Sequence, residues 1–182
     1  MSKLIPQRGD YRDLICYRKA EVIYDITYHF CHKYLQVGDR TIDQMIQAAR
    51  SGKQNIVEGK AASLTSYETH LKLLNVARAS FQELLVDFED YLRTRKLRIW
   101  EADSAKVKAM RELGIKHNDP DFFIRLAEER DDEVIANMII VLIHQEDVLL
   151  RKHIEKQLAK FVNEGGFKES LTKARIEKRK QK

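Results

Sequence analysis

Apolar side chains recur every three or four residues over most of the chain, which is the spacing of one helix face. The first stripe predicts a helix over residues 11–35, and its members are Ile15, Val22, Ile26, Phe30 and Tyr34. Gly38 then acts as a stop signal. Thr41 is the expected N-cap of a second helix that ends near Gly59. Small residues in that helix, Ser51 and Gly52 among them, allow another helix to approach closely.

The third stripe is the clearest, and Ser66 is its expected N-cap. Steps of four and three give a heptad-type pattern at Tyr67, Leu71, Leu74, Arg78, Phe81, Leu85, Phe88 and Leu92. Arg78 is charged, so a buried position requires a counter-charge and hydrogen bonds. We hypothesise that Arg78 pairs with an acidic group from another helix or subunit. The alternative is that its aliphatic stem packs while the guanidinium reaches water.

The helical pattern weakens over residues 97–131. Short helices are expected there over 103–113 and 121–130, separated by the turn signal Asn118-Asp119-Pro120. A fourth long helix is expected over 132–163, before Gly165-Gly166. Its first half is apolar on more than one face, which predicts a second contact surface, either with the insertion or with another subunit.

These elements predict an all-α fold, an antiparallel up-down four-helix bundle. The bundle is expected to be a single domain over residues 1–167, with the helical insertion at about 97–131. Residues 168–182 are expected to form a basic, flexible tail. No apolar run reaches the length of a membrane span, and residues 1–10 lack the apolar core of a signal peptide.

The net charge of +5 is concentrated at the C-terminal end. Residues 168–182 contain seven Lys or Arg and two Glu, so residues 1–167 are neutral overall. A basic tail can bind polyanions, and it can equally be a solvated end. The candidate nucleic-acid contacts in this tail are Lys178, Arg179, Lys180 and Lys182.

Few residues are candidates for catalysis or metal binding. Cys16 and Cys31 lie about 20 Å apart on a straight helix, too far to pair with each other, and buried reduced thiols agree with a cytoplasmic protein. His29 and His32 can share a helix face, but ordinary surface histidines are far more common than metal ligands. Motifs for catalysis, phosphate binding or metal binding are lacking. We therefore predict a protein that is not an enzyme, with no cofactor and no metal.

Two stretches of the sequence resemble a known family. The first runs from residue 41 to 59 and closes in Asn55-Ile56-Val57-Glu58-Gly59; the second contains Ala77-Arg78-Ala79-Ser80 and Glu83-Leu84. The chain resembles the small four-helix-bundle proteins encoded in intervening sequences of bacterial 23S ribosomal RNA genes. This family includes the accessory variability proteins of diversity-generating retroelements. With its insertion and tail, the chain looks like a lengthened member.

The resemblance implies a cytoplasmic bacterial bundle without enzymatic activity. Similar members form homopentamers, and the retroelement members present a basic surface to nucleic acid. The leading hypothesis is therefore a homo-oligomeric adaptor that associates with nucleic acid, specifically RNA. Its candidate contacts on the second helix are Arg50, Lys53 and Lys60. The alternative is a structural scaffold or protein-partner adaptor with no nucleic-acid role. A structural polar cluster is expected from Asn55, Glu58, Arg78 and Glu83.

Overall fold

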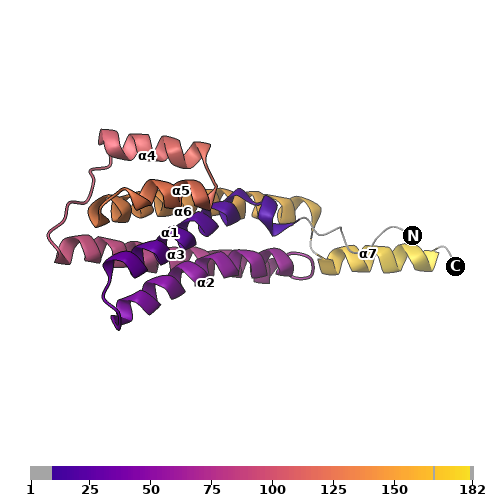
Figure 1. Ribbon diagram of the computed structural model, residues 1–182. Coiled ribbons are helices and arrows are strands. Elements are labelled where there is room, and N and C mark those ends of the chain that lie inside the picture. Colours follow the sequence, from indigo (N-terminus) through magenta and orange to yellow (C-terminus); the bar gives the residue numbers. More distant parts are fainter. Residues whose placement is uncertain (1–9, 166, 181–182) are drawn as a thin grey trace.

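The computed structural model describes residues 10–165 and 167–180, and within these ranges every regular element is helical. The all-α prediction is confirmed. Figure 1 labels the elements, whose bounds are η1 Tyr11–Asp13, α1 Ile15–Tyr34, α2 Arg40–Ala62, α3 Tyr67–Thr94, α4 Ala105–Lys116, α5 Pro120–Glu128, α6 Asp132–Glu164 and α7 Phe167–Lys180.

Side-chain caps set several helix starts. Ser66 caps α3 as predicted, because its hydroxyl accepts the Thr69 N–H. Thr41 is not the N-cap of α2, contrary to expectation. Asp39 takes this role because its carboxylate accepts the Thr41 N–H at 2.9 Å, and α2 therefore starts at Arg40.

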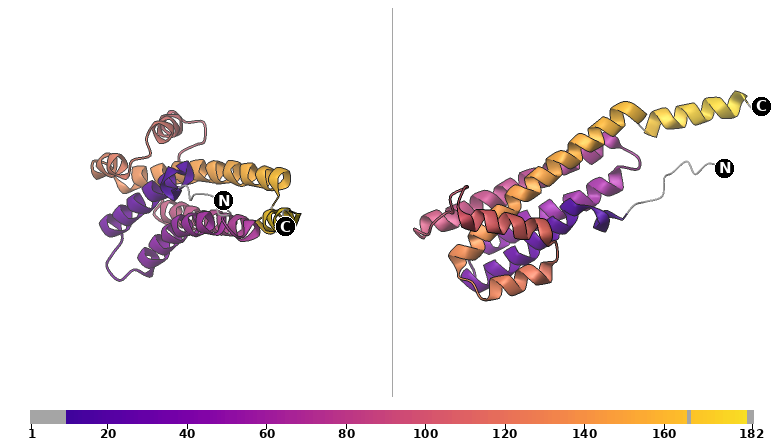
Figure 2. Two further views of the ribbon diagram at one scale, coloured as in Figure 1. Left: turned by 90° about the vertical axis from the view of Figure 1, so that its right-hand side faces the viewer. Right: turned by 90° about the horizontal axis from the view of Figure 1, so that it is seen from above.

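The long helices lie side by side. Helix α2 packs against both α1 and α3, and α6 contacts both α3 and α1. Figures 1 and 2 show these helices lying alongside one another. Their shared core contains a cluster of aromatic rings in which Phe30 of α1 meets Phe88 and Tyr91 of α3 edge-on, at 5.1 and 4.8 Å between centroids. At the α2–α3 contact, the buried Phe81 ring lies against Gly52. A glycine is needed here because a Cβ would fall 2.5 Å from the ring.

Gly59 does not end α2, which continues to Ala62. The residue is buried where the start of α3 returns to α2, and its carbonyl oxygen lies 2.7 Å from Nδ1 of His70. An added Cβ at Gly59 would lie 3.4 Å from the His70 carbonyl oxygen, in van der Waals contact. Gly59 therefore lies near the end of α2, as predicted, and also at the contact between α2 and α3.

The broad apolar face of α6 is covered within the chain. Helix α4 packs on α6 and buries Val107 and Met110, while α5 packs on α1 and buries Phe123. The first half of α6 is consequently buried at consecutive positions from Ile135 to Ile143. Of the two explanations offered by the sequence, the insertion accounts for this surface, so the apolar pattern of α6 is no longer an argument for a second subunit.

A buried asparagine fixes the extended segment before α4. Asn137 of α6 is 2% exposed, and its Oδ1 accepts the Trp100 N–H at 2.7 Å. Its Nδ2 donates to the carbonyl oxygens of Arg98 and Glu133, both at 2.8 Å. The side-chain amide thereby provides hydrogen-bond partners for backbone groups of the extended segment, which has no helical bonds of its own.

The C-terminal end differs from the expected tail in being helical over α7, which follows Gly165 at φ 78°. Figures 1 and 2 show α7 projecting beyond the packed helices. Its flexibility stays a prediction. Among the helices described here, none is long and apolar enough to cross a bilayer.

Candidate nucleic-acid interface

Three rings spaced four residues apart line an outer face of α1. We call Tyr24, Tyr28 and His32 the aromatic row. The Tyr28 and His32 rings stack at 4.1 Å between centroids, and the Tyr24 and Tyr28 rings lie 6.5 Å apart. Tyr28 is 48% exposed and His32 is also exposed. Because a four-residue step advances about 6 Å along a helix with little rotation, the sequence spacing itself produces the row.

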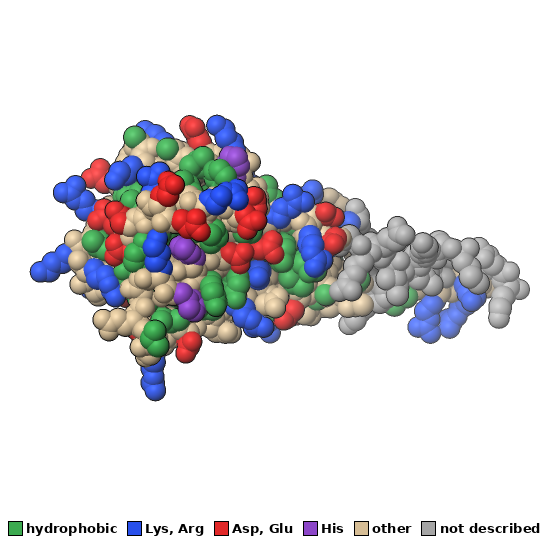
Figure 3. Space-filling view, in the orientation of Figure 1, with side chains coloured by type: hydrophobic (Ala, Val, Ile, Leu, Met, Phe, Trp, Pro, Cys, Tyr) green, Lys and Arg blue, Asp and Glu red, His purple; other side chains and the backbone are tan. Residues whose placement is uncertain are grey.

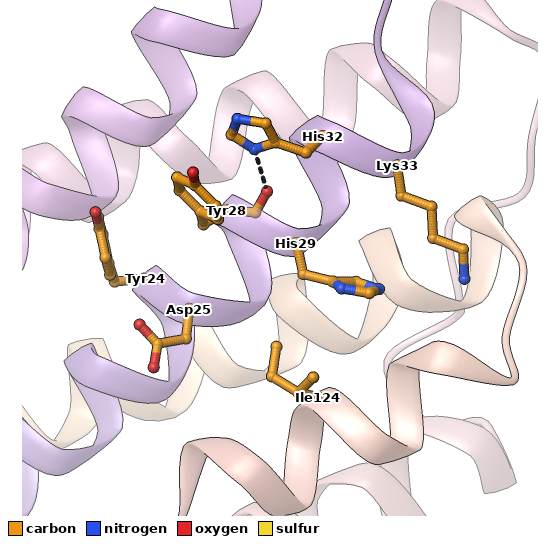
Figure 4. Close-up of a pocket in the computed structure, with 7 residues that line it drawn as sticks. All are labelled: Tyr24, Asp25, Tyr28, His29, His32, Lys33 and Ile124. Carbon is orange, nitrogen blue, oxygen red and sulfur yellow. Dashed lines mark hydrogen bonds between the residues drawn. The ribbon is translucent and has the colours of Figure 1, made fainter.

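The aromatic row borders a cavity of about 620 Å³ beside α1, shown in Figure 4. Nδ1 of His32 lies 2.8 Å from the carbonyl oxygen of Tyr28, one helical turn earlier. This contact fixes the imidazole over the Tyr28 ring. The cavity is lined by Tyr24, Asp25, Tyr28, His29, His32, Lys33 and Ile124, the last from α5.

Basic groups flank both ends of the aromatic row. The Lys53 ammonium of α2 lies 4.1 Å from the centre of the Tyr24 ring, a cation–π contact. At the other end, Lys33 Nζ donates to the Glu128 carbonyl oxygen at 3.0 Å, which ties α1 to the end of α5. The face can therefore offer flat aromatic surface and positive charge to the same ligand.

Burial modifies two titratable groups in this cavity. It raises the pKa of Asp25, opposed by the nearby Lys53 charge and reinforced by the carboxylates of Glu21 and Asp121. Burial also lowers the pKa of His29, with a further contribution from Lys33. Both shifts disfavour the charged forms of these two groups.

The structure brings only part of the predicted basic set to this face. Lys53 adjoins the aromatic row, and Arg50 is exposed one turn earlier on α2. Lys60 lies near the far end of α2, where its charge acts on His70 and His153. In α7, Lys178 and Arg179 are exposed. Lys182 and the side chain of Lys180 lie outside the described residues.

The predicted structural polar cluster does not come together as a unit. Arg78 pairs with Asp147 of α6 at 2.9 Å. Asn55 instead donates to the Ser51 carbonyl oxygen at 2.8 Å, within its own helix. Glu58 and Glu83 are exposed, on α2 and α3. The sequence spacing could not show this, because the partner of Arg78 is 69 residues away along the chain.

His29 and His32 do not form a metal site with neighbouring groups. In Figure 4, the His32 ring lies over Tyr28, whereas the His29 ring points away from it. Over the described residues, no group of three or more His, Cys, Asp or Glu side chains could hold a metal ion.

Sequence reasoning missed a buried polar pair in the core. Lys19 of α1 is 1% exposed, Glu146 of α6 is 0% exposed, and each affects the pKa of the other. The signal was present in the sequence: Lys19 lies between Cys16 and Ile23 on the apolar face of α1. Burial dominates both pKa shifts, lowering that of Lys19 to about 8 and raising that of Glu146.

Acidic and basic side chains are interspersed over the face seen in Figure 3, in keeping with the neutral charge of residues 1–167. A basic patch of the kind that binds duplex phosphate is therefore not visible on that face. Comparison with protein-family models, curated proteins and solved structures finds no match for the chain.

Proposed function

We propose that the protein is a non-catalytic adaptor that holds single-stranded RNA against the aromatic row of α1. The observation that supports this most directly is the exposed Tyr28–His32 stack, extended by Tyr24 and the Lys53 ammonium. Aromatic side chains beside positive charge are the usual components of single-strand binding surfaces, since every base has a flat face to stack. A duplex buries its bases' flat faces and would gain little here.

The charge distribution gives the proposed interaction two separable parts. Residues 1–167 are neutral overall, so binding at the aromatic row rests mainly on stacking. Because few phosphates are neutralised there, this binding should depend weakly on salt. The basic residues of α7, including Lys178 and Arg179, would add a salt-dependent contribution by neutralising phosphates. The two contributions can therefore be distinguished by ionic strength.

Fluorescence anisotropy with a labelled oligouridine tests the proposal. The double variant Tyr28→Ala/His32→Ala should weaken binding at both low and high salt, by about 1–3 kcal/mol for each base that loses its stacking partner. The control is Val86→Ala, which removes an exposed apolar side chain on α3, outside both the aromatic row and the apolar end of α6. A deletion after residue 165 should flatten the salt dependence. Absence of oligouridine binding at low salt contradicts the proposal.

The assembly state is a second part of the proposal. The apolar stripes of the helices support an antiparallel four-helix-bundle arrangement, and the sequence resemblance supports membership of the intervening-sequence family and a homopentamer. One observation favours contact with another chain: Leu158, Phe161 and Val162 are all exposed near the end of α6, at 47%, 38% and 73%. This apolar end also suits the alternative function, a scaffold or protein-partner adaptor without nucleic acid.

Light scattering coupled to size-exclusion chromatography separates these alternatives. A homo-oligomer that dissociates in Val162→Asp, together with no oligouridine binding, favours the scaffold. The matched control is Val37→Asp, which places the same charge at a fully exposed residue between α1 and α2. A strict monomer over a wide concentration range contradicts the homo-oligomer.

A further inference from the structure

A second cavity, of about 500 Å³, lies between α1, α4 and α6, away from the aromatic row. Its wall combines buried Val141 with three side chains that are exposed despite being apolar: Ile15 (53%), Ile115 (74%) and Val148 (38%). Isolated exposed apolar residues need no explanation, but three gathered around one cavity form a surface that water solvates poorly. The volume falls in the range of about 300–1,000 Å³ that is usual for small-molecule sites.

The charged groups that line this cavity are all basic. They are Lys19, Arg111 and Lys152, from α1, α4 and α6, and the lining contains no Asp or Glu. The neighbouring carboxyl of Glu146 is fully buried and does not line the cavity, and burial raises its pKa, which disfavours its charged form. An anionic ligand is therefore favoured over a neutral or cationic one.

Lys19 gives the cavity a buried polar anchor. The residue is 1% exposed, and its ammonium donates to the carbonyl oxygens of Gly114 and His117, at the C-terminal end of α4. An ammonium has three donors, so one remains for a ligand. Because burial lowers the Lys19 pKa to about 8, the group is still predominantly protonated at neutral pH.

Two amides complete the polar part of the wall. Gln145 Nε2 donates to the Arg111 carbonyl oxygen at 2.8 Å, which holds α4 against α6. Asn118 Oδ1 is buried and has no hydrogen-bond partner among the described residues. The orientation of such an amide is set by its partners, so either end of Asn118 can face a ligand.

We propose that this cavity binds one single-chain fatty-acid anion. The acyl chain lies against Ile15, Ile115 and Val148, and the carboxylate lies in the field of Lys19, Arg111 and Lys152. Nucleic acid would leave the apolar wall unused. A volume of about 500 Å³ suits a small molecule. The site is separate from the aromatic row and does not depend on RNA binding.

Calorimetric titration of the full chain with decanoate, below its micelle concentration, tests the proposal. We expect saturable binding of one decanoate per chain. Val148→Trp fills the cavity and should abolish the heat of decanoate binding. Val76→Trp, at a similarly exposed position on α3 (40% against 38%), should leave that heat unchanged. The double variant Arg111→Glu/Lys152→Glu should weaken decanoate binding at least about tenfold while leaving decan-1-ol binding unchanged.

Circular dichroism of each variant shows whether its helices are retained, and the charge-reversal pair alters only exposed side chains. The proposal is overturned if decanoate gives no saturable heat with the native chain. It is also overturned if Val148→Trp binds decanoate normally, or if decanoate and decan-1-ol lose affinity equally in the charge-reversal variant. Binding of an acidic amphipathic peptide without binding of decanoate would assign the cavity to a protein partner instead.

Discussion

Arg78 of α3 and Asp147 of α6 form a half-buried ion pair in which two guanidinium nitrogens, Nε and an Nη, each lie 2.9 Å from the same carboxylate oxygen. The second oxygen of Asp147 accepts from Arg151 Nε, also at 2.9 Å. One carboxylate therefore links α3 to two successive turns of α6. The ion pair thus joins Arg78, the charged member of the α3 stripe, to a helix that is distant in sequence.

A double-mutant cycle on Arg78→Ala and Asp147→Ala should give a coupling free energy of about 1 kcal/mol, because the side chains are only 31% and 20% exposed. Chemical denaturation measures it. The control cycle uses Arg93 and Asp90, an exposed pair at 68% and 56%, and should give about 0.5 kcal/mol or less. Equal couplings for the two pairs would mean that the Arg78 guanidinium acts as a solvated group.

Acid should destabilise the protein through His153. Burial, then the His70, Lys60 and Lys156 charges, lowers the pKa of His153 from 6.5 to about 4. Between these values the unfolded chain binds more protons than the folded chain, so stability is complete above pH 6.5 and falls as the pH drops toward 4. The unfolding free energy should fall by about 1–2 kcal/mol over this interval, once solvent screening of the partly exposed ring is allowed for.

The measurement is the urea unfolding free energy of the native chain and of His153→Leu from pH 8 to pH 4. The variant should show a shallower decline over this interval. Its value at pH 8, where the native ring is neutral, serves as the reference for the packing change alone. Parallel curves for the two proteins would contradict the role of His153.

The carboxyl of Glu146 should act in the opposite sense. Both its oxygens are buried without a hydrogen-bond partner in the described structure, and burial raises its pKa above the ordinary 4.5. The folded chain thus holds a proton that the unfolded chain releases, so this contribution to stability falls as the pH rises above 4.5. Glu146→Gln should therefore stabilise the protein by about 1–2 kcal/mol at pH 8, with little effect at pH 4.

Thermal unfolding at the two pH values tests the Glu146 prediction. Glu155→Gln makes the same chemical change at an exposed residue of α6 and is the matched control. If Glu146→Gln destabilises the protein at pH 8, the carboxylate must be ionised and engaged with Lys19. The pairing would then be a stabilising one.

Two glycines of α2 should respond differently to alanine. At Gly52 the new Cβ would lie 2.5–2.8 Å from the ring of Phe81, which is 1% exposed and cannot move into solvent. Gly52→Ala should therefore cost about 1–3 kcal/mol through overpacking. At Gly59 the nearest atoms are 3.4 Å away, so the helix preference for alanine should roughly cancel the tight contact. Comparable losses in both variants would place Phe81 in a looser environment.

The long helices could be predicted from sequence because each carries its own apolar stripe and its own caps. The α3 prediction succeeded for this reason: Leu74, Phe81 and Phe88 are all buried and Ser66 caps the helix. The start of the first helix was predicted less accurately, because α1 begins at Ile15 and not at residue 11. Leu14 adopts an extended conformation and separates η1 from α1, which a continuous apolar pattern cannot reveal.

Tertiary partners were harder to predict than helices. Nothing in the local spacing identifies Asp147 as the partner of Arg78, or shows that α4 covers α6. The aromatic row could have been read from the four-residue spacing of Tyr24, Tyr28 and His32, but Lys53 joins it only because α2 packs beside α1. Charged positions within apolar stripes, such as Lys19 and Glu146, are the sequence signal that was overlooked.

The contacts of Asn137 also set the permitted length of the chain between α3 and α4. Its side-chain amide accepts from the Trp100 N–H and donates to the Arg98 carbonyl oxygen. Because Asn137 has a fixed place on α6, the number of residues between the end of α3 and Arg98 must match the distance to that place. Adding or removing one residue before Arg98 would break both bonds, whereas changes after Trp100 would leave them in place. The connection is thus intolerant of insertions on one side of this point and permissive on the other.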